Sequence, residues 1–260
     1  MRTIDSDKLD QLPGIRLKSR DIFKFRCHAE LGCFNRCCRN LNLFLYPYDV
    51  LRLKNALGIS SDELLDHHVD VVLRDSNHFP DVLLRMADND EKTCPFLAPS
   101  GCSVYPHRPD TCRTFPVEHG VRYDDDAGKT HPVYFFRPPD FCAGQFESRE
   151  WTVDSWANDQ DAVEYNRFTT GWSEIKWLFR NDPWGAEGPG GAKGKMAFMA
   201  TYNIDRFREF VLGSSFLARY RVKSKILKKM RADEREMLKF GFDWVKFFLW
   251  GIKSKKFNLR

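Results

Sequence analysis

Eight cysteines, all within the first 142 of 260 residues, constrain this chain more than any other feature of its sequence. They fall into a first cluster, a second cluster and one outlier: Cys27, Cys33, Cys37 and Cys38; Cys94, Cys102 and Cys112; and Cys142. A chain of this length can build a hydrophobic core and does not need disulfides as staples. Thiols packed this densely therefore indicate metal binding, since cysteine thiolates hold zinc and iron–sulfur centres.

The composition is that of a globular protein, with 42% hydrophobic residues and 22 phenylalanines. The opening residues lack the basic and apolar regions of a secretory signal, and no apolar run approaches the roughly 20 residues that span a bilayer. We expect a cytoplasmic protein, in which thiols stay reduced. A framework of disulfides is the less favoured alternative.

The first cluster ends in an adjacent pair, Cys37 and Cys38. Neighbouring side chains point to opposite faces of a strand and diverge by about 100° on a helix. The pair would share one centre only from an irregular loop, and would more easily serve two irons of a cluster or two separate sites. Neither cluster has the usual zinc-ribbon or ferredoxin spacing. The spacing thus leaves the metal, and one shared site or two, open.

The second cluster is rich in proline, which favours a rigid path without helix. Arg108 and Arg113 flank it, and we predict that they contact the cofactor site. Guanidinium groups compensate the negative charge of thiolates and donate hydrogen bonds to them. The alternative is that they are solvated surface residues.

Three other side chains are weaker candidates. His28 and His107 lie beside cysteines, but a structural or surface role is favoured over metal ligation. Cys142 is interpreted as the last ligand or a buried thiol, and a nucleophilic thiol is the alternative.

The fold class expected is α+β: an irregular, cysteine-rich metal-binding core with short helices and a few strands, followed by a mainly helical C-terminal region. Residues 1–20 are expected to be a polar leader that packs late or not at all. The expected elements are helices over 47–57 (stopped by Gly58), 61–68 (opened by a capping box at Ser60), 154–168 and 172–179 (interrupted near Gly171), strands over 70–74, 81–86 and 133–137, and a mobile connector over 181–195. Two more helices are expected in the C-terminal region. One begins near Asn203 and carries Ile204, Phe207, Val211 and Leu217 on one face, and the other contains Met237, Trp244 and Phe248.

We predict a cysteine-cluster domain over residues 21–150 and a helical region over 151–260 packed on it, with one compact domain as the alternative. Charge is unevenly divided between the halves. Residues 201–260 contain 16 Lys and Arg against 6 Asp and Glu, a net charge of +10, within a total of +5. A basic region of this kind is a candidate surface for an acidic partner, nucleic acid or an anionic lipid surface. An ordinary solvated helix face is the favoured alternative.

The segments CHAELGCFNRCC and CPFL…GCSVYPHRPDTCRTFP resemble the YkgJ-like cysteine-cluster family, described as a zinc- or iron-chelating domain. The resemblance covers about Arg26 to Cys142. Its matched positions are Cys33, Cys37, Cys38, Cys94, Cys102 and Cys112. Five residues separate Cys27 from Cys33, where tighter spacing is common in the family. The resemblance implies a metal-binding domain but no particular reaction; a distant relative with a similar cysteine cluster is the flagellin lysine methylase.

Together these observations predict a cytoplasmic metalloprotein in which all eight cysteines are metal ligands. The expected cofactor is an iron–sulfur cluster of the 4Fe–4S type, with a redox or protein-modification role on an unknown protein or small-molecule substrate. The alternative is a zinc-binding structural protein that binds a partner through its basic C-terminal helices.

Overall fold

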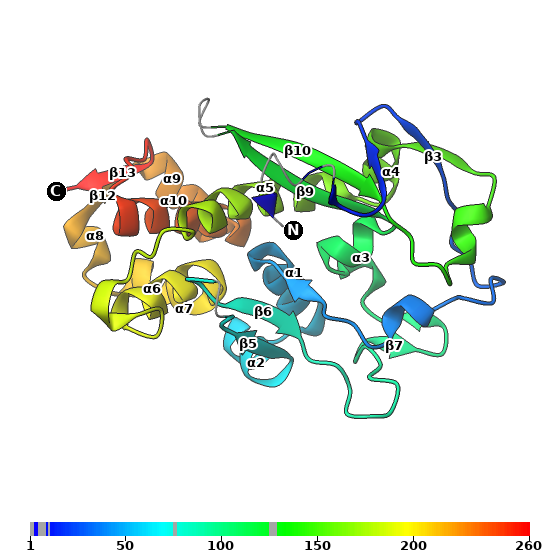
Figure 1. Ribbon diagram of the computed structural model, residues 1–260. Helices are drawn as coiled ribbons and strands as arrows, with labels where there is room; N and C mark the ends of the chain where they lie inside the picture. Colours follow the sequence, from blue (N-terminus) through cyan, green and yellow to red (C-terminus); the bar gives the residue numbers. More distant parts are fainter. Residues whose placement is uncertain (1–2, 5–8, 10, 75–76, 125–128) are drawn as a thin grey trace. The chain divides into compact units, whose positions relative to one another are not determined.

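The computed structural model describes residues 3–4, 9, 11–74, 77–124 and 129–260 (Figure 1). The expected α+β class is confirmed: small antiparallel sheets and short helices occupy the N-terminal half, and the C-terminal region is mostly helical. The chain divides into two compact units, residues 1–44 with 84–177 and residues 45–83 with 178–260. These units do not follow the expected division at residue 150, because segments 45–83 and 151–177 each lie in the other unit.

The largest sheet of the first unit has the strand order β1-β9-β10-β2. The strands β9 (Val117–Asp124) and β10 (Lys129–Phe136) pair antiparallel. The strand β1 (Thr3–Ile4) pairs parallel with β9, and β2 (Ile15–Leu17) pairs antiparallel with β10. The expectation that residues 1–20 form an unpacked leader is therefore wrong for the described part of that segment, because these two short strands gain backbone hydrogen bonds from the β9–β10 pair.

A second, two-stranded sheet of this unit pairs β3 (Ile22–Lys24) with β11 (Glu150–Thr152). Beneath it lies a hydrophobic core that includes Phe23, Phe25, Trp156 and Cys142. Both phenylalanine rings meet Trp156 edge to face. This core positions the cysteine half of the chain, because Cys142 is itself one of its buried members.

The helices of the first unit differ from the expected ones. Helix α4 (Val153–Asp159) and helix α5 (Ala162–Leu178) are separated at Asp161, which has a φ of +52°. The expected interruption near Gly171 is wrong, since α5 runs through that residue. Burial of Trp172 and its apolar neighbours on α5 outweighs the roughly 1 kcal/mol that glycine costs inside a helix.

The second unit begins as the sequence predicts. Helix α1 (Pro47–Leu57) ends at Gly58 in the left-handed region, with a φ of +67°. Helix α2 (Ser61–His67) has the predicted capping box between Ser60 and Glu63. A three-stranded sheet follows, in the order β4-β6-β5, formed by Phe44–Leu45, Asp81–Leu84 and Val69–Val72.

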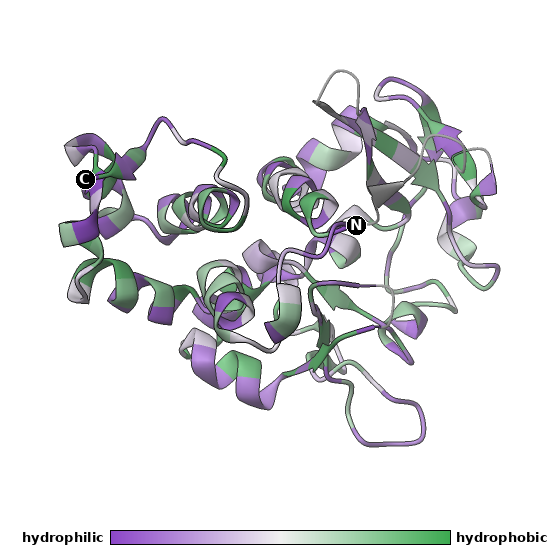
Figure 2. Cartoon of the chain, turned by 60° about the vertical axis from the view of Figure 1, so that its left-hand side comes forward, coloured by the Kyte–Doolittle hydropathy of each residue, from purple (hydrophilic) through white to green (hydrophobic). Residues whose placement is uncertain are grey.

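The rest of the second unit is a set of helices around an aromatic core. The elements are η5 (Gly185–Glu187), α6 (Ala192–Thr201), α7 (Ile204–Gly213), α8 (Phe216–Arg219), α9 (Ser224–Ala232) and α10 (Glu234–Trp250), with β12 (Tyr220–Val222) paired to β13 (Phe257–Leu259). Figure 2 shows hydrophilic and hydrophobic residues alternating along these helices. Phe207, Phe240 and Trp244 are buried and in ring contact.

Two expectations for this region are wrong. The connector expected over 181–195 contains η5 and the first turn of α6, because Gly191 serves as the N-cap of that helix. Leu217 belongs to α8 and not to the helix that follows Asn203. Within the described part of the chain, no helix is both long enough and apolar enough to cross a membrane.

Candidate metal centre

All eight cysteines lie in the first unit and are present as thiols. Most of them sit on short or irregular elements, as the proline-rich sequence predicts. The adjacent pair ends a single 3₁₀ turn, η2 (Arg36–Cys38). Cys102 ends the two-residue strand β8 (Gly101–Cys102), and Cys112 lies on the five-residue helix α3 (Asp110–Thr114). Short elements of this kind allow the chain to curl, so that sulfurs from several places can face a common point.

The two cysteine clusters come together through the backbone. The N–H of Cys94 donates a hydrogen bond of 2.8 Å to the carbonyl of Cys38, and an isolated antiparallel bridge joins Arg39 to Thr93. The N–H of Asn40 also donates to the carbonyl of Lys92, at 2.9 Å. Cys38 and Cys94, which are 56 positions apart in the sequence, are therefore held side by side by backbone hydrogen bonds.

Cys142 joins the first cluster in space. The N–H of Ala143 donates a hydrogen bond of 3.2 Å to Sγ of Cys33. The N–H of Arg26 donates to the carbonyl of Gly144, at 3.1 Å. Burial raises the pKa of the Cys142 thiol. A raised pKa lowers the thiolate fraction, which argues against the alternative that Cys142 is a reactive nucleophile.

Neighbouring sulfurs oppose one another's ionisation. Burial, followed by the nearby Cys37, Cys142 and Cys33, raises the pKa of Cys27 to about 11. The Cys37 thiol donates a hydrogen bond to Cys38, and this bond raises the pKa of Cys37 and lowers that of Cys38. Thiols that lie this close together lose their protons readily only when a cation compensates the negative charge of the thiolates. Metal binding supplies that cation and releases the protons.

Backbone N–H groups are aimed at several of the sulfurs. Burial raises the pKa of Cys94 and of Cys102, while hydrogen bonds from the N–H groups of Phe96 and Val104 lower them. The N–H groups of Gly144 and Gln145 act on Cys142 in the same way. Hydrogen bonds to cysteine sulfur stabilise the thiolate and tune a bound iron–sulfur centre. The donor set of this unit thus fits a thiolate-ligated zinc or iron site.

The thiols are not arranged as a complete metal-binding site. Among the residues that the structure describes, no group of three or more His, Cys, Asp or Glu side chains is placed so that it could hold a metal ion. Cysteine sites commonly take their final geometry only as the metal binds. The assignment of all eight cysteines as ligands stays a prediction.

The two predicted arginine contacts have different surroundings. The Arg108 guanidinium lies 3.8 Å from the Tyr105 ring centroid, donates to Gln160 Oε1 at 2.6 Å, and is close enough to Cys102 and Cys112 to interact with them electrostatically. Arg113 is buried, and it donates to the backbone carbonyls of Gln160 and Pro106. Contact between either side chain and a cofactor stays a prediction, and Arg108 is the better placed of the two.

The two histidine candidates occupy different surroundings. The ring nitrogens of His28 lie 3.6 Å from a carboxylate oxygen of Glu30 and 3.8 Å from one of Glu147. His107 ends the 3₁₀ turn η3 (Tyr105–His107). The carboxylate neighbours of His28 suit its favoured structural or surface role, and the role of His107 stays a prediction.

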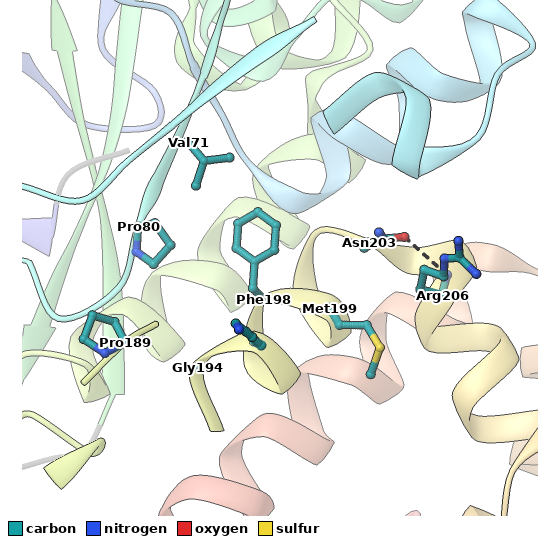
Figure 3. Close-up of a pocket in the computed structure, with 9 residues that line it drawn as sticks. Val71, Pro80, Pro189, Gly194, Phe198, Met199, Asn203 and Arg206 are labelled. Carbon is teal, nitrogen blue, oxygen red and sulfur yellow. Dashed lines mark hydrogen bonds between the residues drawn. The ribbon is translucent and has the colours of Figure 1, made fainter. Parts of the chain in front are cut away.

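A separate groove of about 430 Å³ lies on the second unit (Figure 3). Apolar side chains from β5, α6 and the loops beside them line most of it; Phe198 points toward Val71 and Pro80. Lys195 and Arg206 are its charged lining residues. None of the lining residues is a cysteine, a histidine or a carboxylate, so the groove is not a candidate metal site.

Sequence reasoning missed the backbone contacts that join the clusters. The close approach of the Arg26 backbone to Gly144 had a signal in the sequence, because a glycine stands two residues after Cys142 in PPDFCAGQ. A Cβ at this position would lie 2.6 Å from the Arg26 carbonyl oxygen, so only glycine lets the two segments touch. The backbone hydrogen bond between Cys94 and Cys38 had no signal in the sequence, since any residue other than proline can supply a backbone donor.

Comparison with known proteins yields a family match that spans the cysteine region. Residues 26–144 match the CxxCxxCC family, whose description is "Putative zinc- or iron-chelating domain". No curated protein and no solved structure matches the chain. The matched segment begins one residue before Cys27 and ends two after Cys142, so it contains every thiol described above. Residues 26–144 therefore belong to the CxxCxxCC, YkgJ-like family of zinc- or iron-chelating domains.

Proposed function

We propose that this domain binds an iron–sulfur cluster through cysteine thiolates and uses it in electron transfer or in modification of a protein or small-molecule substrate. The observation that carries the proposal is the hydrogen bond between the Cys94 N–H and the Cys38 carbonyl, which joins the two cysteine clusters. A site assembled from thiolates alone suits iron–sulfur chemistry.

Three features favour iron–sulfur over a single structural zinc ion. Eight thiols exceed the four ligands of such a zinc site. Backbone N–H groups and the Arg108 guanidinium lie near the sulfurs, and such groups raise the reduction potential of a cluster. Cys142 is buried in an aromatic core, which shields a redox centre from water. We place the protein in a reducing compartment such as the cytoplasm, where thiols persist.

The test is optical and uses the full chain, purified without oxygen. We expect a brown protein whose visible absorption bleaches when dithionite is added. Cys38→Ser should lose about half or more of that absorption and lower the melting temperature, because metal binding and folding are coupled. His28→Asn is the matched control, because it changes a candidate beside a cysteine without removing a thiol, and it should keep both. A colourless wild-type protein would contradict the proposal.

The second candidate is a zinc-binding structural protein that binds an acidic partner or an anionic surface. It is favoured by α9, on which Lys225, Lys228, Lys229 and Arg231 are all exposed. Colourless protein with stoichiometric zinc would support it, provided that binding to anionic vesicles weakens with salt and is lost when Lys225 and Lys228 are both changed to Glu.

A further inference from the structure

The cysteines divide into two groups of four, with the adjacent pair split between them. The first thiol set comprises Cys27, Cys33, Cys37 and Cys142. The second thiol set comprises Cys38, Cys94, Cys102 and Cys112. The division begins in η2, a 3₁₀ turn in which neighbouring side chains leave the axis about 120° apart. Cys37 and Cys38 therefore leave the backbone in different directions.

Backbone contacts hold the first thiol set together. The segment that carries Cys27 touches the turn after Cys142, at the bond from the Arg26 N–H to the Gly144 carbonyl. Cys33 accepts the hydrogen bond from the Ala143 N–H at its sulfur, and its carbonyl accepts one of 3.0 Å from Arg36, the residue before Cys37. The electrostatic neighbours of Cys27 are the other three members of this set.

Backbone contacts also hold three members of the second thiol set together, Cys38, Cys94 and Cys102. Cys94 is bound to Cys38 by the 2.8 Å backbone hydrogen bond, and the Cys94 carbonyl accepts a bond of 3.0 Å from the Leu97 N–H. Leu97 in turn pairs directly with Cys102 between β7 (Leu97–Ala98) and β8. The sulfurs that act on Cys38 electrostatically, apart from its neighbour Cys37, are Cys112, Cys94 and Cys102.

The two sets are neighbours. The thiols of Cys37 and Cys38 are hydrogen-bonded to each other, and Cys37 also acts electrostatically on Cys94. A single site built around these three sulfurs is the competing arrangement. Such a site would have to bring Cys27 and Cys102 to one centre, although the contacts above tie Cys27 to the turn after Cys142 and Cys102 to the segment of Cys94.

We propose that the domain holds two adjacent metal centres, one ligated by each thiol set, with Cys37 serving the first centre and Cys38 the second. This inference rests on the proposed function. Four thiolates are the full ligand set of a 4Fe–4S cluster or of a structural zinc ion. Each set thus supplies a complete centre and leaves no thiol over.

The test compares metal content between paired variants of the full chain, purified without oxygen. The same-set pair is Cys27→Ser with Cys33→Ser, and the cross-set pair is Cys27→Ser with Cys102→Ser. Each pair removes two thiols and shares one substitution, so each serves as the control for the other. We expect about eight irons per wild-type chain, a twofold loss in the same-set pair and loss of nearly all iron in the cross-set pair.

Equal metal content in the two pairs, or about four irons per wild-type chain, would overturn the two-centre assignment while leaving the iron–sulfur proposal standing. Two zinc ions in the wild-type chain, with one left in the same-set pair and none in the cross-set pair, would support two centres and contradict the iron–sulfur proposal. Wild-type protein without metal would overturn both. If a variant does not fold, the iron content of the wild-type chain decides between one centre and two. Electron paramagnetic resonance of the fully reduced protein supplies a second readout, since adjacent clusters broaden each other's signals and a lone cluster does not.

Discussion

His119 is a half-buried histidine on β9 whose ring nitrogens have unlike surroundings. Its Nδ1 lies within hydrogen-bond distance of Asn166 Oδ1, at 3.2 Å, and its ring stacks on Tyr134 with the centroids 5.1 Å apart. Its Nε2 is buried and has no hydrogen-bond partner among the described residues. Burial lowers the pKa of His119 to about 4, from an ordinary value of 6.5. The folded protein therefore keeps this ring neutral.

The lowered pKa predicts a loss of stability in acid. The unfolded chain takes up a proton at His119 below about pH 6.5, whereas the folded protein does so only near pH 4. The contribution of the neutral His119 ring to the unfolding free energy is therefore complete above pH 6.5 and is lost as the pH falls toward 4. Between pH 7.5 and pH 5, wild type should lose about 2 kcal/mol more unfolding free energy than His119→Gln.

Urea unfolding at the two pH values, with metal content checked in each sample, measures this difference. Acid effects on the metal centre are common to both proteins and cancel in the comparison. Equal losses in wild type and variant would show that His119 does not contribute to the acid sensitivity.

At the scale of single residues, local chemistry was predictable and long-range contact was not. Gly58 and the Ser60–Glu63 capping box were predictable, because cap geometry depends on residues within one turn. The left-handed Asp161, which separates α4 from α5, was missed because aspartate adopts that conformation only occasionally. The approach of Arg26 to Gly144 depends on segments more than a hundred residues apart.

Among the elements, helices α6 and α10 make an unusually close contact. A Cβ on Gly241 of α10 would overlap the carbonyl oxygen of Ala200 on α6. Gly241 is buried, and so is Ala200. Glycine at this position lets the two backbones approach more closely than any other residue would allow.

This contact predicts opposite effects for two glycine-to-alanine changes. Gly241→Ala should destabilise the protein by about 2 kcal/mol, because the added methyl meets backbone that cannot rotate away. Gly213→Ala is the matched control at the end of α7, where a Cβ meets nothing within 4 Å; it should be neutral or stabilising by up to about 1 kcal/mol. Urea midpoints measure both. A Gly241→Ala protein as stable as the control would show that the helices can separate freely.

Helix and strand existence was predictable where periodicity was strong. The helix over 47–57 was identified with its limits, since Pro47 and Gly58 mark its ends. The strand β9 was missed, because charged and small residues interrupt its apolar alternation and its partner β10 supplies much of its stability. Pairing between strands is a tertiary property, and strand propensity reports it weakly.

At the scale of the whole molecule, the two units interleave along the chain. The chain passes between them after Phe44, after Leu83 and after Trp177. All three points fall inside regular elements, β4, β6 and α5, so no Gly- or Pro-rich linker marks them. A division at residue 150 was expected from composition, since the cysteines end and the helical region begins there; composition cannot report which segments share a core.

The candidate site was predictable in kind, and its arrangement was not. Clustered thiols indicate a metal whatever the fold, because few other roles require them. The proposed assignment of Cys37 and Cys38 to different sets rests on the contacts of Arg26 with Gly144 and of Cys38 with Cys94, which no spacing rule contains.

The central claim is that cysteine thiolates in residues 26–144 hold iron–sulfur chemistry, and one measurement tests it most directly. Iron, acid-labile sulfide and zinc are determined together in the wild-type chain after purification without oxygen. We predict iron and sulfide in equal amounts, in stoichiometric quantity, with no stoichiometric zinc. Stoichiometric zinc without sulfide, or metal-free protein whose cysteines are paired in disulfides, would contradict the account.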